Sequence, residues 1–100
     1  MNDYLYLMHN DVPADRAASS EAAWETYLAG LRASGRFDGG SAMGGGVALR
    51  KDGAPVAISA GLGGYLRVRA ESLDEARRFL AGNPVYENGG TVEIRELPRD

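Results

Sequence analysis

The stretch Leu62–Leu97 constrains the fold more than any other part of this chain, because its hydrophobic period changes at chemically marked boundaries. Apolar and polar side chains alternate over Tyr65–Ala70, which predicts a strand with one buried face. Ser72 and Glu75 then have the spacing of a capping box, in which each side chain accepts a free backbone N–H at a helix start. A glycine pair leads into a final strand over Thr91–Leu97. The buried stripe of the predicted helix consists of Leu73, Ala76 and Leu80, with Phe79 beside it.

The N-terminal part has the same order of elements. Tyr4–His9 is a short, almost unbroken apolar run, which predicts a buried strand. Ser19 or Ser20 can cap a helix over 20–34, and Gly35 is suited to end it in the left-handed conformation. The apolar face of this helix contains Trp24, Tyr27, Leu28 and Leu31, whereas Glu25 and Arg32 are assigned to the rest of its surface.

The middle of the chain predicts two further features. Phe37–Met43 is a candidate strand that its glycines weaken. Asp52-Gly53, between VALRK and APVAIS, is a strong hairpin signal, and Pro55 suits an edge arm. The complete order predicts one α+β domain over residues 1–100, a ferredoxin-like β-α-β-β-α-β sandwich with an extra hairpin and both helices on one face of the sheet.

The sheet face without helices carries the residues that point away from the predicted core, among them Tyr65, Arg67, Arg69, Thr91, Glu93 and Arg95. The first strand adds either Tyr4, Tyr6 and Met8 or Leu5, Leu7 and His9, and the sequence favours the tyrosines here because the leucines suit a core. Surfaces rich in tyrosine and arginine are enriched at interfaces. The face therefore predicts a sheet-to-sheet homodimer. The alternative is a solvated face on which Arg67 or Arg69 pairs with Glu93.

The chain resembles the YCII-related superfamily, and within it the DGPF branch. The resemblance lies in Leu62-Gly63-Gly64-Tyr65, in Ser72-Leu73-Asp74-Glu75-Ala76, in Asn83-Pro84 and in Gly89-Gly90-Thr91-Val92-Glu93-Ile94, with YLYLMHND as the opening strand. It implies a dimeric α/β barrel formed by two facing sheets.

The sequence departs from this resemblance at positions that matter for chemistry. Ala54 and Pro55 follow Asp52-Gly53 where the branch has a Pro-Phe pair. The histidine that some YCII proteins have on the first helix falls near Ala23 or Trp24 here, and the aspartate before a proline is Asn83. An asparagine cannot accept a proton at neutral pH, so the acid–base pair that the resemblance implies is missing.

The remaining candidates for chemistry are few. His9, the only histidine, is a candidate proton-transfer residue that Asp11 could orient, or a strand-end histidine bonded to a loop. The predicted ligand-binding residues are Tyr6, Arg67, Arg69, Asn83, Tyr86, Glu87 and Arg95. The run GGSAMGGG leads into a strand, which is typical of a loop or bulge and not of a phosphate loop, although it could cover a pocket mouth.

Composition excludes several functions. The net charge is −3 and there is no cysteine, which disfavours a nucleic-acid binder, a disulfide and a thiolate site. No metal site, cofactor or membrane span is predicted, and a cytoplasmic protein is expected. We therefore expect a homodimeric domain that binds a small, acidic metabolite or acts as an accessory module. The alternative is a lyase- or dehalogenase-like enzyme that uses His9 with a nearby carboxylate.

Overall fold

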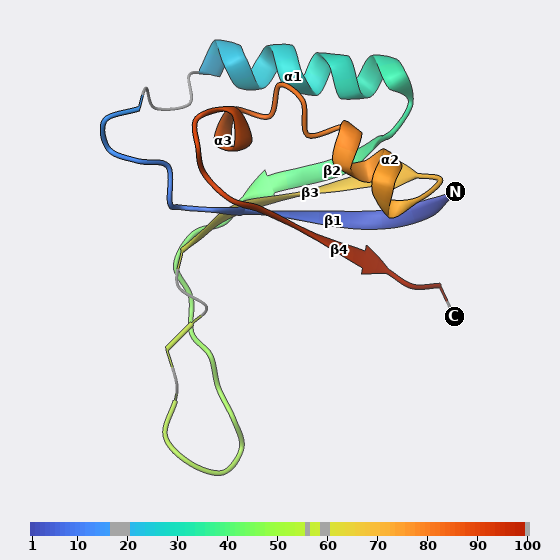
Figure 1. Cartoon of the computed structure of the whole chain (residues 1–100). Helices are drawn as coiled ribbons and strands as arrows, with labels where there is room; N and C mark the ends of the chain where they lie inside the picture. Colours follow the sequence, from blue (N-terminus) through green and yellow to red (C-terminus); the bar gives the residue numbers. More distant parts are fainter. Residues whose placement is uncertain (17–20, 56, 59–60, 100) are drawn as a thin grey trace.

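The computed structural model describes residues 1–16, 21–55, 57–58 and 61–99. In chain order the elements are β1 (Asn2–His9), α1 (Glu21–Ser34), β2 (Phe37–Ala42), β3 (Leu62–Ala70), α2 (Leu73–Arg78), α3 (Pro84–Glu87) and β4 (Val92–Leu97). The strands form a 4-stranded antiparallel sheet in the order β2-β3-β1-β4. The helices lie together on one side of it (Figure 1). This arrangement confirms the ferredoxin-like α+β fold, with the first strand at the centre.

The central strand β1 has the opposite orientation to the one that the sequence favoured. Tyr4, Tyr6 and Met8 are buried under the helices, and Leu5 and Leu7 are half-buried on the other face. The reason is a hydrogen bond that spans two elements. The hydroxyl of Tyr6 donates to the carbonyl oxygen of Ala76 in α2. A tyrosine can occupy a core when its hydroxyl has such a partner, so apolar character alone does not decide which side chains point inward.

The flanking strands have the predicted orientation. Leu66, Val68 and Ala70 of β3 are buried, and Val92 and Ile94 of β4 pack against the same core. Their pairing with β1 fixes this register. Tyr6 lies opposite Leu66 on one side and Ile94 on the other, so all three side chains point toward the helices.

The helix boundaries follow from local chemistry. Gly35 has a φ of 75°, and Arg36 N donates to Leu31 O, which together end α1 as the sequence predicts. Ser19 and Ser20 lie outside the described residues. Ser72 Oγ accepts from Glu75 N at 3.2 Å, whereas Glu75 Oε1 accepts from the backbone N of Glu71, one residue before the position of a standard capping box.

The predicted buried stripe of α2 is wrong at its first residue. Leu73 is 50% exposed, whereas Ala76 and Leu80 are buried. The helix ends at Arg78, so Leu80 lies on the following turn and not on a continuation of the same helix. The helical period therefore does not extend to Leu80. Leu73 is the first residue of α2 and is exposed although its spacing from Ala76 places both on one face.

The polar bend before β4 contains a short helix, α3, that the sequence did not predict. Asn83 is its N-cap, and Asn83 Oδ1 accepts from the backbone N of Val85 and of Tyr86 at 3.0 and 3.2 Å. Pro84 occupies the first helical position, where its missing N–H is not needed. The proline that ends regular structure after α2 therefore also starts α3.

Residues 43–55 and 57–58 belong to a long excursion that projects away from α1 (Figure 1). It turns at Asp52-Gly53 as predicted, where Gly53 has a φ of 118° and Arg50 Nε donates to Ala54 O. The structure assigns no strand to residues 43–55 and 57–58, because a two-stranded arm without a packing partner is only marginally stable. Val47 and Leu49 are 76% and 73% exposed. The radius of gyration, 14.9 Å, exceeds the roughly 13 Å of a compact chain of this length.

Candidate functional site

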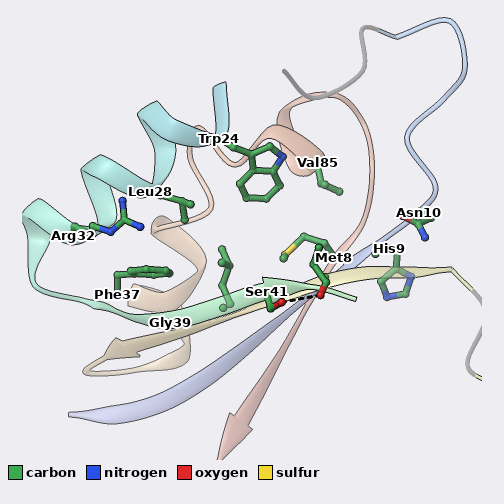
Figure 2. A pocket seen from close by; sticks show the side chains of 15 residues that line it. Met8, His9, Asn10, Trp24, Leu28, Arg32, Phe37, Gly39, Ser41 and Val85 are labelled. Atoms are coloured by element: carbon green, nitrogen blue, oxygen red, sulfur yellow. Dashed lines mark hydrogen bonds between the residues drawn. The ribbon is translucent and has the colours of Figure 1, made fainter. Parts of the chain in front are cut away.

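A pocket of about 560 Å³ opens between α1 and the part of the sheet formed by β2 and β3. Trp24 and Leu28 reach down from α1, Phe37 and Met8 rise from the sheet, and Val85 closes one end from α3 (Figure 2). These side chains pack against the core but leave a hollow between them. The pocket exists because α1 lies over the β2 edge, where small residues do not fill the space beneath the helix.

Glycines form much of the pocket's sheet side, for a steric reason. A Cβ at Gly40 would lie 2.5 Å from the carbonyl oxygen of Tyr65 and 2.6 Å from Leu66 Cδ2. A Cβ at Gly63 would collide with the side-chain amide of Asn10. The register between β2 and β3 shifts between Phe37 and Gly40, which agrees with the bulge predicted for the glycine run. Gly39, Gly40, Gly63 and Gly64 therefore give the pocket a wall made largely of backbone.

Polar groups stand at the rim of this pocket. Arg32 lies with Cζ 5.3 Å from the centre of the Phe37 ring, a cation–π contact. Ser41 and Asn10 also line it, and Ser41 Oγ donates to Ala42 O at 2.8 Å. The sequence placed Arg32 away from the apolar face of α1, which is wrong. Trp24, Leu28 and Arg32 are spaced four residues apart, and that spacing could have identified one shared face.

The structure gives His9 a different partner from the predicted one. His9 Nε2 lies 3.2 Å from Glu93 Oε1, and Figure 2 shows the ring on the side of the sheet away from Trp24. His9 therefore borders the pocket, but its ring does not point into it. Hydrogen bonds from Arg95 first, and then from His9, hold the pKa of Glu93 below its usual range.

Asp11 is engaged by Thr91. Asp11 Oδ1 accepts from the backbone N of Thr91 at 2.8 Å, and Oδ2 accepts from its hydroxyl at 2.5 Å. These hydrogen bonds lower the pKa of Asp11. The carboxylate thus fixes the loop before β4, and the predicted pair of His9 with Asp11 is replaced by two separate contacts.

The arginines predicted to bind a ligand on the uncovered sheet face have carboxylate partners. Arg69 Nη2 lies 3.2 Å from Asp38 Oδ1, and Arg67 Nε lies 3.6 Å from the other oxygen of Asp38. Arg95 lies 3.0 Å from Glu93. Ion pairs therefore occupy this face, but the expected partner is wrong: Arg67 and Arg69 share Asp38 on β2, and Arg69 also lies 3.9 Å from Asp3, whereas Glu93 pairs with Arg95.

The other predicted ligand-binding residues have structural positions. Tyr6 is enclosed beneath α2, and burial raises its pKa. Asn83 is buried and caps the N-terminus of α3. Glu87 Oε2 accepts a hydrogen bond from Gly82 N at 2.9 Å. Tyr86 is 51% exposed. None of the four is among the described residues that line the pocket.

Asn83 nevertheless has one unusual feature. Its Nδ2 is buried and has no hydrogen-bond partner within residues 1–16, 21–55, 57–58 and 61–99. Burial raises the pKa of the neighbouring Tyr27 to about 12, and the Asn83 side chain opposes that rise. The Tyr27 hydroxyl donates to Phe79 O at 2.7 Å, which ties α1 to the end of α2.

The described part of the chain contains no group of three or more histidines and carboxylates placed to hold a metal ion. It also contains no helix that is both long and apolar enough to pass through a membrane.

Comparisons with known proteins identify a matching domain family by sequence and a similar solved structure. The profile of the YCII-related domain matches residues 4–99. No curated protein is matched by sequence. The chain is similar in structure to 5-chloro-2-hydroxyhydroquinone dehydrochlorinase (TftG) from Burkholderia phenoliruptrix AC1100, solved in complex with 2,5-dihydroxybenzoquinone. The TM-score is 0.58, the identity is 20%, and the match covers 98% of this chain and 95% of that one.

Proposed function

We propose that this chain, which belongs to the YCII-related domain family, binds a small molecule in the pocket beneath α1 and acts as a homodimer. The observation that carries the proposal is the pocket itself. Its volume of about 560 Å³ falls within the roughly 300–1,000 Å³ of typical ligand sites. Its lining has the usual composition of such a site, with apolar and aromatic walls and a few polar groups at the rim.

The similarity to TftG supports a ring-sized ligand. That protein was solved with 2,5-dihydroxybenzoquinone, a planar six-membered ring. The pocket of this chain offers Trp24 and Phe37 as flat surfaces, and backbone at the glycines (Figure 2). The resemblance implies a histidine near Ala23 or Trp24 and an aspartate at Asn83, and the chain has no histidine at the first place and the capping residue Asn83 at the second. The proposal is therefore binding without a catalytic acid–base pair.

The binding test uses ligand-induced stabilisation. A panel of small planar and acidic metabolites is screened by thermal shift, because a ligand held only by the folded state stabilises it by about 2.7 kcal/mol at 100 times its Kd. The panel includes 2,5-dihydroxybenzoquinone. Leu28→Gln changes the pocket wall, and Ala29→Gln, at the adjacent exposed position, is the matched control. We expect the shift in Leu28→Gln to shrink and the shift in Ala29→Gln to equal wild type. If no compound of the panel raises the melting temperature of the wild type or of either variant, the proposal is refuted.

The uncovered sheet face supports the homodimer. Three apolar or aromatic side chains of this face are half-buried in the single chain: Leu5, Leu7 and Tyr65. The ion pairs of Arg67 and Arg69 with Asp38 lie on the same face. Tyr65 and Leu7 are neighbours in the β1–β3 register. A domain of 100 residues buries a limited share of its surface alone, so covering this face with a second copy would add stability. The exposed apolar residues among 43–55 and 57–58, which are Met43, Val47, Leu49 and Ile58, add surface for the same partner.

Analytical ultracentrifugation tests the dimer. Leu7→Lys places a charge at the centre of the face and is expected to yield monomers at concentrations where wild type is dimeric. Leu73→Lys, an exposed leucine on the helix side, is the control. Monomeric wild type at micromolar concentration refutes the assembly.

A second candidate function rests on the contact between His9 and Glu93. The 3.2 Å separation lets the carboxylate orient the imidazole, as a general acid or base requires. The assay is chloride release from 5-chloro-2-hydroxyhydroquinone by wild type, His9→Ala and Glu93→Gln. Release that His9→Ala abolishes supports an enzyme, and the absence of release in wild type removes this candidate.

A further inference from the structure

We infer that the pocket beneath α1 selects a planar aromatic anion, with the ring against Trp24 and the glycine wall and the negative group on Arg32. The inference rests on the proposed function, since it names the chemical class of that ligand. It places the acidic ligand at a different site from the arginines of the uncovered sheet face.

The preference for an anion follows first from the charge of the residues that line the pocket. Arg32 makes no ion pair with any carboxylate of the described residues, whereas Arg36 lies 2.6 Å from Glu75 and the sheet-face arginines pair with Asp38. The described lining of the pocket contains no aspartate or glutamate. An anion at this rim would therefore meet a cation with no competing acid beside it. Arg67 and Arg69 already share a carboxylate, whereas Arg32 does not, which makes Arg32 the better anion site.

The second step rests on the position of Arg32. Its guanidinium Cζ lies over the Phe37 ring, 5.3 Å from the ring centre. Stacking uses the flat face of a guanidinium and leaves the N–H groups at its edge available for hydrogen bonds. A carboxylate or enolate in the pocket can accept two of these in the bidentate manner. Lysine would supply the charge without this geometry.

The shape of the lining carries the third step. Trp24 and Met8 flank the hollow, and aromatic rings and thioethers make favourable contacts with a ring ligand. On the sheet side, Gly40 and Gly64 present backbone, because there is no room for a Cβ at Gly40. A wall without side chains admits a flat molecule more readily than a branched one. Trp24 also contacts Tyr27 edge-to-face, with ring centres 6.0 Å apart, which helps to hold its indole in place.

The test compares probes that separate charge from planarity. Isothermal titration calorimetry is run with benzoate, 2,5-dihydroxybenzoquinone, benzamide, cyclohexanecarboxylate and acetate. Benzoate has a ring and a charge, benzamide has the ring alone, and cyclohexanecarboxylate has a charge on a non-planar ring. We expect the two planar anions, benzoate and the ionised 2,5-dihydroxybenzoquinone, to bind at least tenfold more tightly than the other three probes. The chain has one tryptophan, so its fluorescence reports occupancy beside Trp24 directly.

Arg32→Gln and Arg32→Lys test the cation. Arg32→Gln is expected to weaken benzoate at least tenfold and to leave benzamide unchanged, whereas Arg32→Lys recovers part of the loss. The matched control is Arg77→Gln, since Arg77 is an exposed arginine outside the pocket, near Asp74. Because Arg32 is on the surface, the melting temperature of both Arg32 variants is expected to stay near that of wild type.

The outcomes separate this inference from the proposed function. If benzamide and benzoate bind equally and Arg32→Gln changes neither, the preference for an anion is refuted and the binding pocket stands. If cyclohexanecarboxylate matches benzoate, the preference for a planar ring is refuted. If no probe binds at millimolar concentration and the fluorescence of Trp24 does not change, the proposed function fails as well.

Discussion

Replacing Tyr6 by phenylalanine removes one buried hydroxyl and leaves the ring in place. Tyr6 is 0% exposed, and its hydroxyl donates to the carbonyl oxygen of Ala76. The ring volume is kept, so no cavity contributes to the free energy of unfolding. The lost hydrogen bond and the less satisfied Ala76 carbonyl together predict a destabilisation of about 1–2 kcal/mol. The lower part of the range applies if the carbonyl keeps its other donor, the backbone N of Phe79 at 3.2 Å.

The assay is urea unfolding followed by circular dichroism, at one fixed protein concentration because the proposed dimer makes stability concentration-dependent. We expect the midpoint to fall with an unchanged m-value. The melting temperature should fall by about 4–8 °C for each kcal/mol in a domain of this size. Tyr86→Phe is the control, since Tyr86 is 51% exposed and a surface change of this kind stays within about 0.5 kcal/mol.

The result discriminates between the two orientations of β1. If the Tyr6→Phe protein unfolds like the Tyr86→Phe control while its dimer dissociates more readily, the tyrosines face the partner subunit. The arrangement of β1 under the helices would then be wrong.

Three further predictions concern packing and pH. Gly40→Ala should destabilise the fold by about 1–3 kcal/mol in urea unfolding, because its Cβ would lie 2.5 Å from the carbonyl oxygen of Tyr65; an unchanged midpoint contradicts this. Hydrogen bonds from Thr91 lower the folded-state pKa of Asp11, so its stabilisation is present above about pH 4 and is lost as the pH falls. Asp11→Asn should therefore lose less stability than wild type between pH 5 and pH 3, and parallel curves would refute this role. Burial raises the pKa of Tyr27 from 10 to about 12, so its contribution is present below pH 10 and is lost as the pH rises to 12. Tyr27→Phe should flatten alkaline unfolding curves, and an equally steep curve would show that Tyr27 ionises freely in the folded state.

Local chemistry explains why most elements could be predicted. Gly35 ends α1, Ser72 begins α2, and the alternation of β3 identifies its buried side, because each signal depends on residues within a few positions of one another. The short helix α3 escaped prediction because its four residues are too few to show a period, although Asn83-Pro84 is an N-cap followed by a suitable first residue.

The candidate site was predicted less well than the fold. The sequence identified His9 and the arginines of the sheet as candidates by residue type alone. In the structure His9 pairs with Glu93, and the arginines of β3 pair with Asp38. Trp24 and Phe37 were treated as core or strand residues, and the pocket that they line depends on how far α1 stands from the β2 edge. Linear spacing contains no information on that separation.

The sequence by itself determined the order of strands and helices, most of their ends and the ferredoxin-like topology, since caps, glycines and periodicity act over short range. The tertiary structure decided which face of β1 is inside, which acids pair with which arginines, and where a cavity remains. Those outcomes depend on contacts between residues as far apart in the chain as Tyr6 and Ala76. Such contacts form only once the elements pack, so the side with the better-satisfied polar groups becomes the core.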